Sequence, residues 1–111
     1  MLVSFVNIIK KIMRMKSKRS KACDISQKVR AIVTERDKWC IFCGRTGNHL
    51  CHLRPRSSGG LGIPENLVLG CFTCHMKLDQ SEHRKEMLEF ALNHLLKHYP
   101  DFNDEDRYYH K

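Results

Sequence analysis

The sequence predicts a small α+β domain in which helices flank a two-stranded sheet and a metal ion closes the fold. Three observations indicate this. Two Cys-x-x-Cys pairs stand 27 residues apart. The loop between them carries two short apolar runs bounded by turn residues, which predict strands. Apolar residues recur at helical spacing before and after this loop, and 111 residues suffice for one domain with tails.

The two cysteine pairs have the pattern of a closed, four-thiolate zinc site. Each pair binds from a tight knuckle, so one ion would tie the two ends of the loop together. A domain of this size has a limited core and gains from such a staple. A redox role for the pairs fits less well, because no thioredoxin-like βαβ pattern accompanies them. We therefore expect one structural Zn²⁺ with these ligands: Cys40, Cys43, Cys71 and Cys74.

The first residues do not have the pattern of a secretion signal, because their positive charges follow the apolar stretch 2–9 instead of preceding it. That stretch is also too short to span a bilayer. We therefore expect a cytoplasmic chain with no membrane partner, in which paired cysteines bind metal and do not form disulfides. Two explanations of residues 1–15 stay open. They form a short amphipathic helix, or they precede a true start at Met13 or Met15.

Positive charge is concentrated near the N-terminus. The formal net charge is +8, and seven Lys and Arg residues lie between Lys10 and Lys21, whereas the other 13 basic residues nearly balance the 12 acidic ones. Such a segment attracts polyanions such as DNA, although a solvated arm without a partner would have the same composition. We interpret residues 1–23 as a basic, flexible arm, residues 24–100 as the folded domain, and residues 101–111 as a C-terminal tail without a motif.

A helix is expected directly after the arm. Asp24 or Ser26 can cap it, and it should run to about Arg36. Its apolar face is formed by residues at i, i+4, i+7 and i+8, namely Ile25, Val29, Ile32 and Val33. Trp39, which directly precedes the first cysteine pair, is expected to pack in the core beside the metal.

Two helices are expected after the loop. A short one should begin near the second cysteine pair and carry His75. Asp79 followed by Glu82 resembles a capping box, which would begin a long helix that ends before Pro100. The apolar stripe of this helix is Leu88, Leu92, Leu95 and Tyr99. We expect its histidines at the surface: His83, His94 and His98.

The loop itself is expected to hold two antiparallel strands, at residues 48–53 and 67–70. The segment 54–66 between them is rich in Gly, Ser and Pro and is too long for a tight turn. Polar residues that could serve a function lie at both ends of this segment, and we therefore expect the segment to be ordered.

The residues from Cys51-His52 through Arg56-Ser57-Ser58-Gly59-Gly60 and Pro64-Glu65-Asn66 to Cys74-His75 resemble the motif of the HNH endonucleases. These are the ββα-metal nucleases, here of the branch with zinc knuckles, and the match covers residues 38–80. It rests on His52, Asn66 and His75, with 13 and 8 residues between them, combined with the glycine turn and the four cysteines. The flanking segments are also similar to small HNH proteins of bacteriophages and prophages.

The resemblance implies a small zinc-bound ββα-metal (HNH) core with flanking N- and C-terminal helices. It also implies a metal-dependent endonuclease that hydrolyses DNA phosphodiester bonds. His52 would be the general base, Asn66 would brace the loop and orient the base or the metal, and His75 would bind a catalytic divalent cation, Mg²⁺ or Mn²⁺. Beside them, Arg54 and Arg56 are candidates for binding phosphate.

One departure from the family pattern concerns Cys51. Many members carry Asp or His directly before the base as a second metal ligand, and a thiolate matches Mg²⁺ poorly. Three alternatives stay open: His75 holds the ion with substrate and water, Cys51 binds a softer ion, or another residue such as His49 contributes. In an extended strand, however, His49 and His52 face opposite sides.

A second function stays open for the whole chain. A non-catalytic, zinc-stabilised module that binds nucleic acid would need the cysteine pairs but not His52. The polar residues of the motif would then be ordinary hydrogen-bonded groups around a zinc fold. The chain has no room for a separate recognition domain, so low sequence specificity or an additional protein partner, of phage origin by the resemblance, is expected.

Overall fold

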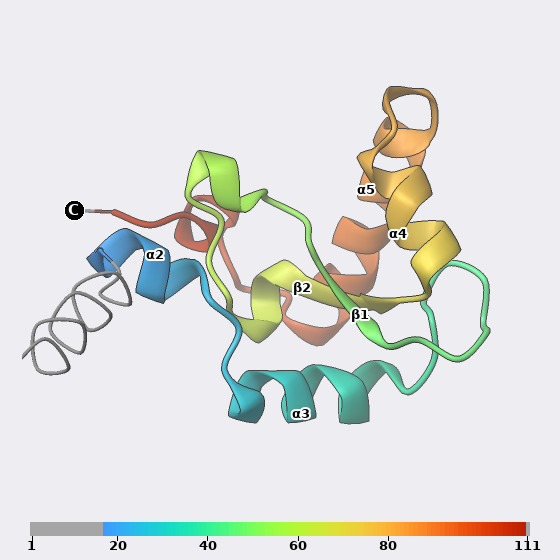
Figure 1. The fold of residues 1–111 in the computed structure, drawn as a ribbon, viewed down its shortest axis with the longest axis horizontal. Coiled ribbons are helices and arrows are strands. Elements are labelled where there is room, and N and C mark those ends of the chain that lie inside the picture. Colours follow the sequence, from blue (N-terminus) through green and yellow to red (C-terminus); the bar gives the residue numbers. More distant parts are fainter. Residues whose placement is uncertain (1–16, 111) are drawn as a thin grey trace, which may run out of the picture.

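The computed structural model describes residues 17–110, apart from the side chain of Ser81. In chain order its elements are α2 (Lys18–Cys23), α3 (Gln27–Asp37), β1 (His49–His52), the 3-10 turns η1 (Arg56–Ser58) and η2 (Pro64–Asn66), β2 (Leu67–Gly70), α4 (Phe72–Asp79), α5 (Ser81–His98) and the 3-10 turn η3 (Asp104–Arg107). The prediction of a small domain of helices and a two-stranded sheet is confirmed (Figure 1). The expectations for residues 1–15 lie outside the described residues.

The sheet lies between α3 on one side and α4 with α5 on the other (Figure 1). β1 and β2 are antiparallel, and Leu50 pairs with Leu69 while Cys51 pairs with Val68. Because side chains alternate along a strand, each pair supplies one face. Leu50 and Leu69 pack towards α3 together with Val33. Cys51 and Val68 pack towards α4 and α5 in a cluster completed by Leu53, Leu78, Ala91 and Leu95.

Helix α3 begins as the sequence predicts. The Ser26 hydroxyl accepts a hydrogen bond from the Val29 N–H at 3.1 Å and so caps the first turn. Val33 is fully buried and Val29 is half-buried against the sheet, whereas Ile32, at 40% exposed, lies at the edge of the apolar face. After α3 the chain turns sharply at Lys38, whose φ is +63°.

This turn explains why the expectation for Trp39 was wrong. The Trp39 side chain is 58% exposed, whereas the side chain of Asp37 has no exposed surface. The carboxylate accepts hydrogen bonds from Arg36 and from the Leu69 N–H. A charged group at the end of α3 therefore takes the inward position, and the reversal at Lys38 leaves the indole outside.

Helix α4 begins at the second cysteine pair, as expected, with Cys71 at its N-cap. The long helix α5 follows after a single linking residue, Gln80, which caps it without a side-chain hydrogen bond. The predicted capping box of Asp79 and Glu82 is therefore wrong, because Asp79 is still the last residue of α4. No helix in the described part of the chain has the length and apolar character needed to cross a bilayer.

The described end of the basic arm is helical and in contact with the domain. Ser17 caps α2 through a hydrogen bond from the Ser20 N–H, and Cys23 is only 2% exposed. The Gly62 N–H donates to the Ala22 carbonyl at 3.0 Å. A Cβ at Gly62 would lie 2.1 Å from the Asp24 carbonyl oxygen, so only glycine allows this close approach. The sequence interpretation, which treated these residues as part of an arm, missed this helix.

The segment between the strands is ordered by the C-terminal tail, which the sequence analysis left without a role. Arg107 is 6% exposed and donates from Nε to the Glu65 carbonyl at 2.7 Å. The Leu61 N–H donates to the Arg107 carbonyl, and the Tyr109 N–H donates to the Gly59 carbonyl, both at 2.8 Å. Residues 101–110 thus form part of the wall around this segment.

Candidate functional site

Four cysteine sulfurs gather where the two knuckles meet. The Sγ atoms of Cys40, Cys43, Cys71 and Cys74 all lie within 4.8 Å of one another. The first knuckle is shaped by hydrogen bonds from the Cys40 N–H to the Arg45 carbonyl and from the Gly44 N–H to the Cys40 carbonyl, and Gly44 has a φ of +79°. The four cysteines are close enough to hold a structural metal such as zinc, with all four positions taken by sulfur.

The second knuckle favours a thiolate at its first position. The Cys74 N–H donates to Cys71 Sγ at 3.4 Å, and this hydrogen bond lowers the pKa of the Cys71 thiol to about 7. Metal ligands must be deprotonated, and sulfur at the start of a helix is stabilised in that form. The donor set therefore suits a soft or borderline ion such as Zn²⁺.

The two faces of β1 divide the HNH-like residues into two groups. His49 and Cys51 lie on the face towards α4, where the His49 ring stacks on the His75 ring at 5.5 Å and 7°. His52 lies on the other face, where its Nε2 contacts the Cys23 carbonyl at 3.0 Å. The structure therefore places His75 beside Cys51, and no contact joins the His52 and His75 rings among the described residues.

The environment of His52 fixes its tautomer. A carbonyl oxygen only accepts, so Nε2 carries the proton that is donated to Cys23. Nδ1 then holds the free electron pair, and within residues 17–110 it has no hydrogen-bond partner. Burial lowers the pKa of His52 below its ordinary value and the Arg56 charge acts in the same direction, while the hydrogen bond to Cys23 opposes them. The ring is therefore neutral at pH 7, as a proton acceptor must be.

Of the two arginines expected to bind phosphate, Arg56 lies beside His52. Its Nη1 donates to the same Cys23 carbonyl at 2.9 Å and pairs with Asp24 at 2.8 Å, and its side chain is 45% exposed. Sequence reasoning missed Arg19, which lines a depression of about 170 Å³ together with Arg56 and Cys23. Arg19 Nη2 donates to the Ser57 carbonyl at 3.0 Å, and only its position in the basic segment pointed towards it.

Arg54 points away from this depression. Its Nε and Nη2 donate to the two carboxylate oxygens of Asp104, both at 2.9 Å. This bidentate pair holds the tail against the loop and raises the pKa of Arg54. Its charge is thereby balanced within the chain, as the more exposed charge of Arg56 is by Asp24.

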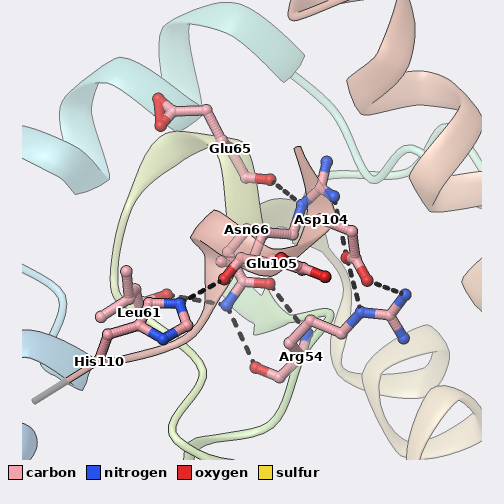
Figure 2. A network of polar contacts seen from close by, with 8 residues as sticks. Arg54, Leu61, Glu65, Asn66, Asp104, Glu105 and His110 are labelled. Carbon is pink, nitrogen blue, oxygen red and sulfur yellow. Dashed lines mark hydrogen bonds and ion pairs between the residues drawn. The ribbon is translucent and has the colours of Figure 1, made fainter. Parts of the chain in front are cut away.

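Asn66 is fully buried and connects both ends of the loop (Figure 2). Its Oδ1 accepts from the Arg54 N–H at 2.9 Å, and its Nδ2 donates to the carbonyls of Arg54 and Leu61 at 3.1 and 2.8 Å. The Leu53 N–H also donates to the Asn66 carbonyl. These bonds fix the strand end that carries His52, and burial of the Asn66 side chain keeps its amide oxygen away from solvent.

His75 lies beside two groups with possible metal-ligand atoms, Cys51 and Asp79. Its Nδ1 lies 3.3 Å from Cys51 Sγ, and its Nε2 lies 3.7 Å from the Asp79 carboxylate. Burial raises the pKa of Cys51 to about 12, so its sulfur is a neutral thiol and a poor ligand for Mg²⁺. His75 and the 63% exposed Asp79 are the residues here whose ligand atoms are open to solvent.

Neither a model of a known protein family nor a curated protein matches this chain.

Proposed function

We propose that this protein is a metal-dependent HNH endonuclease that hydrolyses phosphodiester bonds in DNA. The observation that carries the proposal is the state of His52: a neutral ring whose Nε2–H is held by the Cys23 carbonyl and whose Nδ1 is free to take a proton.

The order of elements also supports the proposal. β1, β2 and α4 follow one another around the cysteine cluster, which is the arrangement that a ββα-metal core requires. His52 ends β1 and His75 lies in the first turns of α4. The residue before the base, Cys51, contacts His75, so the two motif positions that hold the cation in the family are neighbours here.

The residues of the chain would share the reaction as follows. Nδ1 of His52 takes the proton of the attacking water while Cys23 keeps the ring oriented. Arg56 and Arg19 draw the phosphate towards His52 from the adjoining depression. A divalent cation held by His75 would supply charge neutralisation at the phosphate and the leaving oxygen. Asn66 keeps the loop closed beneath the base.

A plasmid-cleavage assay tests this function. Wild type, His52→Ala and His52→Gln are compared with Mg²⁺, Mn²⁺, Ni²⁺ or Zn²⁺ added. The glutamine amide can donate to the Cys23 carbonyl as Nε2 does, but it cannot accept the water proton. Both variants should cleave roughly 10²–10⁴-fold more slowly, the usual effect of a positioned acid–base group. Because the pKa of His52 is lowered, the wild-type rate should fall only below about pH 6.5, the ordinary histidine value.

The matched control is His83→Ala, which removes an exposed histidine of α5 and should cleave at the wild-type rate. DNA affinity and zinc content should stay unchanged in every variant. Cleavage by His52→Ala at the wild-type rate would contradict the proposal, and it would favour the non-catalytic nucleic-acid-binding module.

A further inference from the structure

A second cluster of metal-ligating groups lies between the end of α3 and α5. Ligand atoms of Asp37, His94 and His98 all lie within 4.8 Å of one another. Asp37 ends α3, and the two histidines stand four residues apart near the end of α5. In the described residues, this cluster and the four cysteines are the groups that satisfy this distance.

The carboxylate of Asp37 is held in a fixed orientation. Its Oδ2 accepts from the Leu69 N–H and from Arg36 Nη2, both at 2.9 Å, and its Oδ1 accepts from Arg36 Nε at 2.7 Å. The remaining contact of Oδ1 is His94 Nε2 at 2.8 Å. Burial alone would raise the pKa of Asp37, but these hydrogen bonds outweigh it and hold the pKa below its usual value. The group is therefore an anion with one lone pair directed at His94.

The two histidines present their rings from one side of α5. Residues four apart on a helix lie on the same face, and the rings meet edge to face with centroids 4.9 Å apart. His94 is half-buried and His98 is exposed, so the cluster opens to solvent through His98.

We propose that Asp37, His94 and His98 bind one transition-metal ion of the Zn²⁺ class, at a site separate from the cysteine cluster. Two imidazoles and one carboxylate are ligands that Zn²⁺, Ni²⁺ and Co²⁺ accept, whereas Mg²⁺ and Ca²⁺ prefer oxygen alone. Three protein ligands leave a fourth, open position for water or an external group.

Binding replaces the proton on His94 Nε2 by the metal ion. That proton is lost to water while Nδ1 takes up another, so the ring stays neutral, and the Oδ1 lone pair that accepted the hydrogen bond turns to the ion. Bonds of about 2.0–2.2 Å in a tetrahedron place ligand atoms about 3.3 Å apart, so the 2.8 Å contact between Oδ1 and Nε2 opens only slightly. The exposed ring of His98 supplies the third protein ligand.

The positive charge of Arg36 opposes the binding of a cation at this site. The hydrogen bonds of Arg36, however, point its guanidinium away from the position proposed for the ion. Besides its two bonds to Asp37, its Nη1 donates to the Pro64 carbonyl at 2.8 Å and its Nη2 to the Leu67 carbonyl at 2.6 Å. The guanidinium is thus anchored in the loop, on the side of the carboxylate away from solvent. The exposed His98 side stays open for the ion.

The test measures Zn²⁺ stoichiometry and thermal stability of the full-length protein. Wild type, His98→Ala and the control His83→Ala are saturated with Zn²⁺, and the bound ions per chain are counted by native mass spectrometry. Wild type and His83→Ala should hold one ion more than His98→Ala, in which affinity for that ion should fall roughly 100-fold or more, since even outer-sphere partners of a metal change affinity by 10–100-fold.

Thermal melting distinguishes the full site from a helix that only binds metal through its two histidines. Asp37 and His94 come from different helices, so an ion between them cross-links the fold and should raise Tm of wild type when Zn²⁺ exceeds the amount that fills the cysteines. The increase should be absent in His98→Ala. Equal stoichiometry in wild type and His98→Ala, or a second ion that leaves Tm unchanged, would overturn the proposal. No cleavage is measured, so the outcome is independent of the nuclease assay.

Discussion

The cysteine cluster and the cluster of Asp37, His94 and His98 differ in the origin of their ligands. The cysteines come from two knuckles whose spacing is local, and their sulfurs surround one point with all positions filled. The second cluster joins the end of one helix to the end of another, and its carboxylate is already occupied by Arg36 and a backbone N–H. A metal ion would therefore stabilise the first cluster, whereas the second is hydrogen-bonded without one.

This difference indicates which of the two clusters contributes to the stability of the fold. Four thiols brought within 4.8 Å gain little from one another, and a closed thiolate site contributes its binding free energy to folding. The second cluster instead resembles a hydrogen-bonded network that is complete before any ion arrives, because no buried side-chain nitrogen or oxygen of the described residues lacks a partner. A ligand added to it shifts stability only by mass action.

The largest effect is expected from removal of the cysteine metal. Cys74→Ser, or a strong chelator acting on wild type, should unfold the core, since structural Zn²⁺ contributes about 10–16 kcal/mol of apparent binding free energy in small zinc domains. Circular dichroism should report loss of α4 and α5, and the transition should recover when Zn²⁺ is returned to wild type but not to Cys74→Ser.

The control for this experiment is Cys23→Ser, which alters a buried thiol outside the cluster. It should keep its zinc and its helices. An unchanged melting curve after verified removal of all zinc would show that the cysteine cluster, like the second cluster, is complete without an ion.

A smaller effect is expected from Asp37→Asn. The Asp37 and Arg36 side chains are 0% and 8% exposed, and breaking a buried ion pair from one side costs about 3–5 kcal/mol because the other charge stays buried. The folded pKa of Asp37 lies below its unfolded value. Its contribution to stability is therefore fully present above about pH 4 and is lost as pH falls through the folded pKa. Urea melts of wild type and variant from pH 7 to pH 2 should converge.

Asp104→Asn is the matched comparison for Asp37→Asn, because it changes an exposed carboxylate and not a buried one. Asp104 also pairs with arginines, but its side chain is 46% exposed, and exposed pairs contribute about 0–1 kcal/mol. A loss for Asp104→Asn as large as that for Asp37→Asn would mean that burial does not set the difference between the two carboxylates.

Much of this fold could be predicted because its signals are local. Ser26 caps α3, the two knuckles bring the cysteines together, and the apolar runs at 49–52 and 67–70 pair as strands. Strand alternation also predicted that His49 and His52 would point to opposite faces, and their contacts with His75 and the Cys23 carbonyl agree.

The contacts that surround the candidate site could not be predicted in this way. The partner of His52 lies 29 residues away on α2, and the partner of Arg54 lies 50 residues away in the tail. No residue type or spacing marks a backbone carbonyl as the acceptor for a particular histidine. Trp39 was assigned to the core for its size alone, whereas the turn at Lys38 decides which side chain enters.

The smallest effect is expected at His94, where two variants separate the hydrogen bond from the metal site. His94→Ala removes a donor to a buried carboxylate, and a hydrogen bond to a charged group contributes about 1.5–3 kcal/mol. The half-buried position and the remaining donors to Asp37 place the expected loss at the lower end. His94→Gln can still donate to Oδ1 from its amide, so it should lose much less stability in chelator-free urea melts with the cysteines loaded. Glutamine is a weak ligand for Zn²⁺, however, so this variant should lose the second ion as fully as His94→Ala does.

Two outcomes would contradict this prediction. If His94→Gln keeps the ion, then His98 and Asp37 alone bind it. If His94→Gln loses as much stability as His94→Ala, the histidine ring is needed for packing and not for its proton. Stability kept and metal lost in one variant would show that the network is complete without the ion, which is the property that separates this cluster from the cysteines.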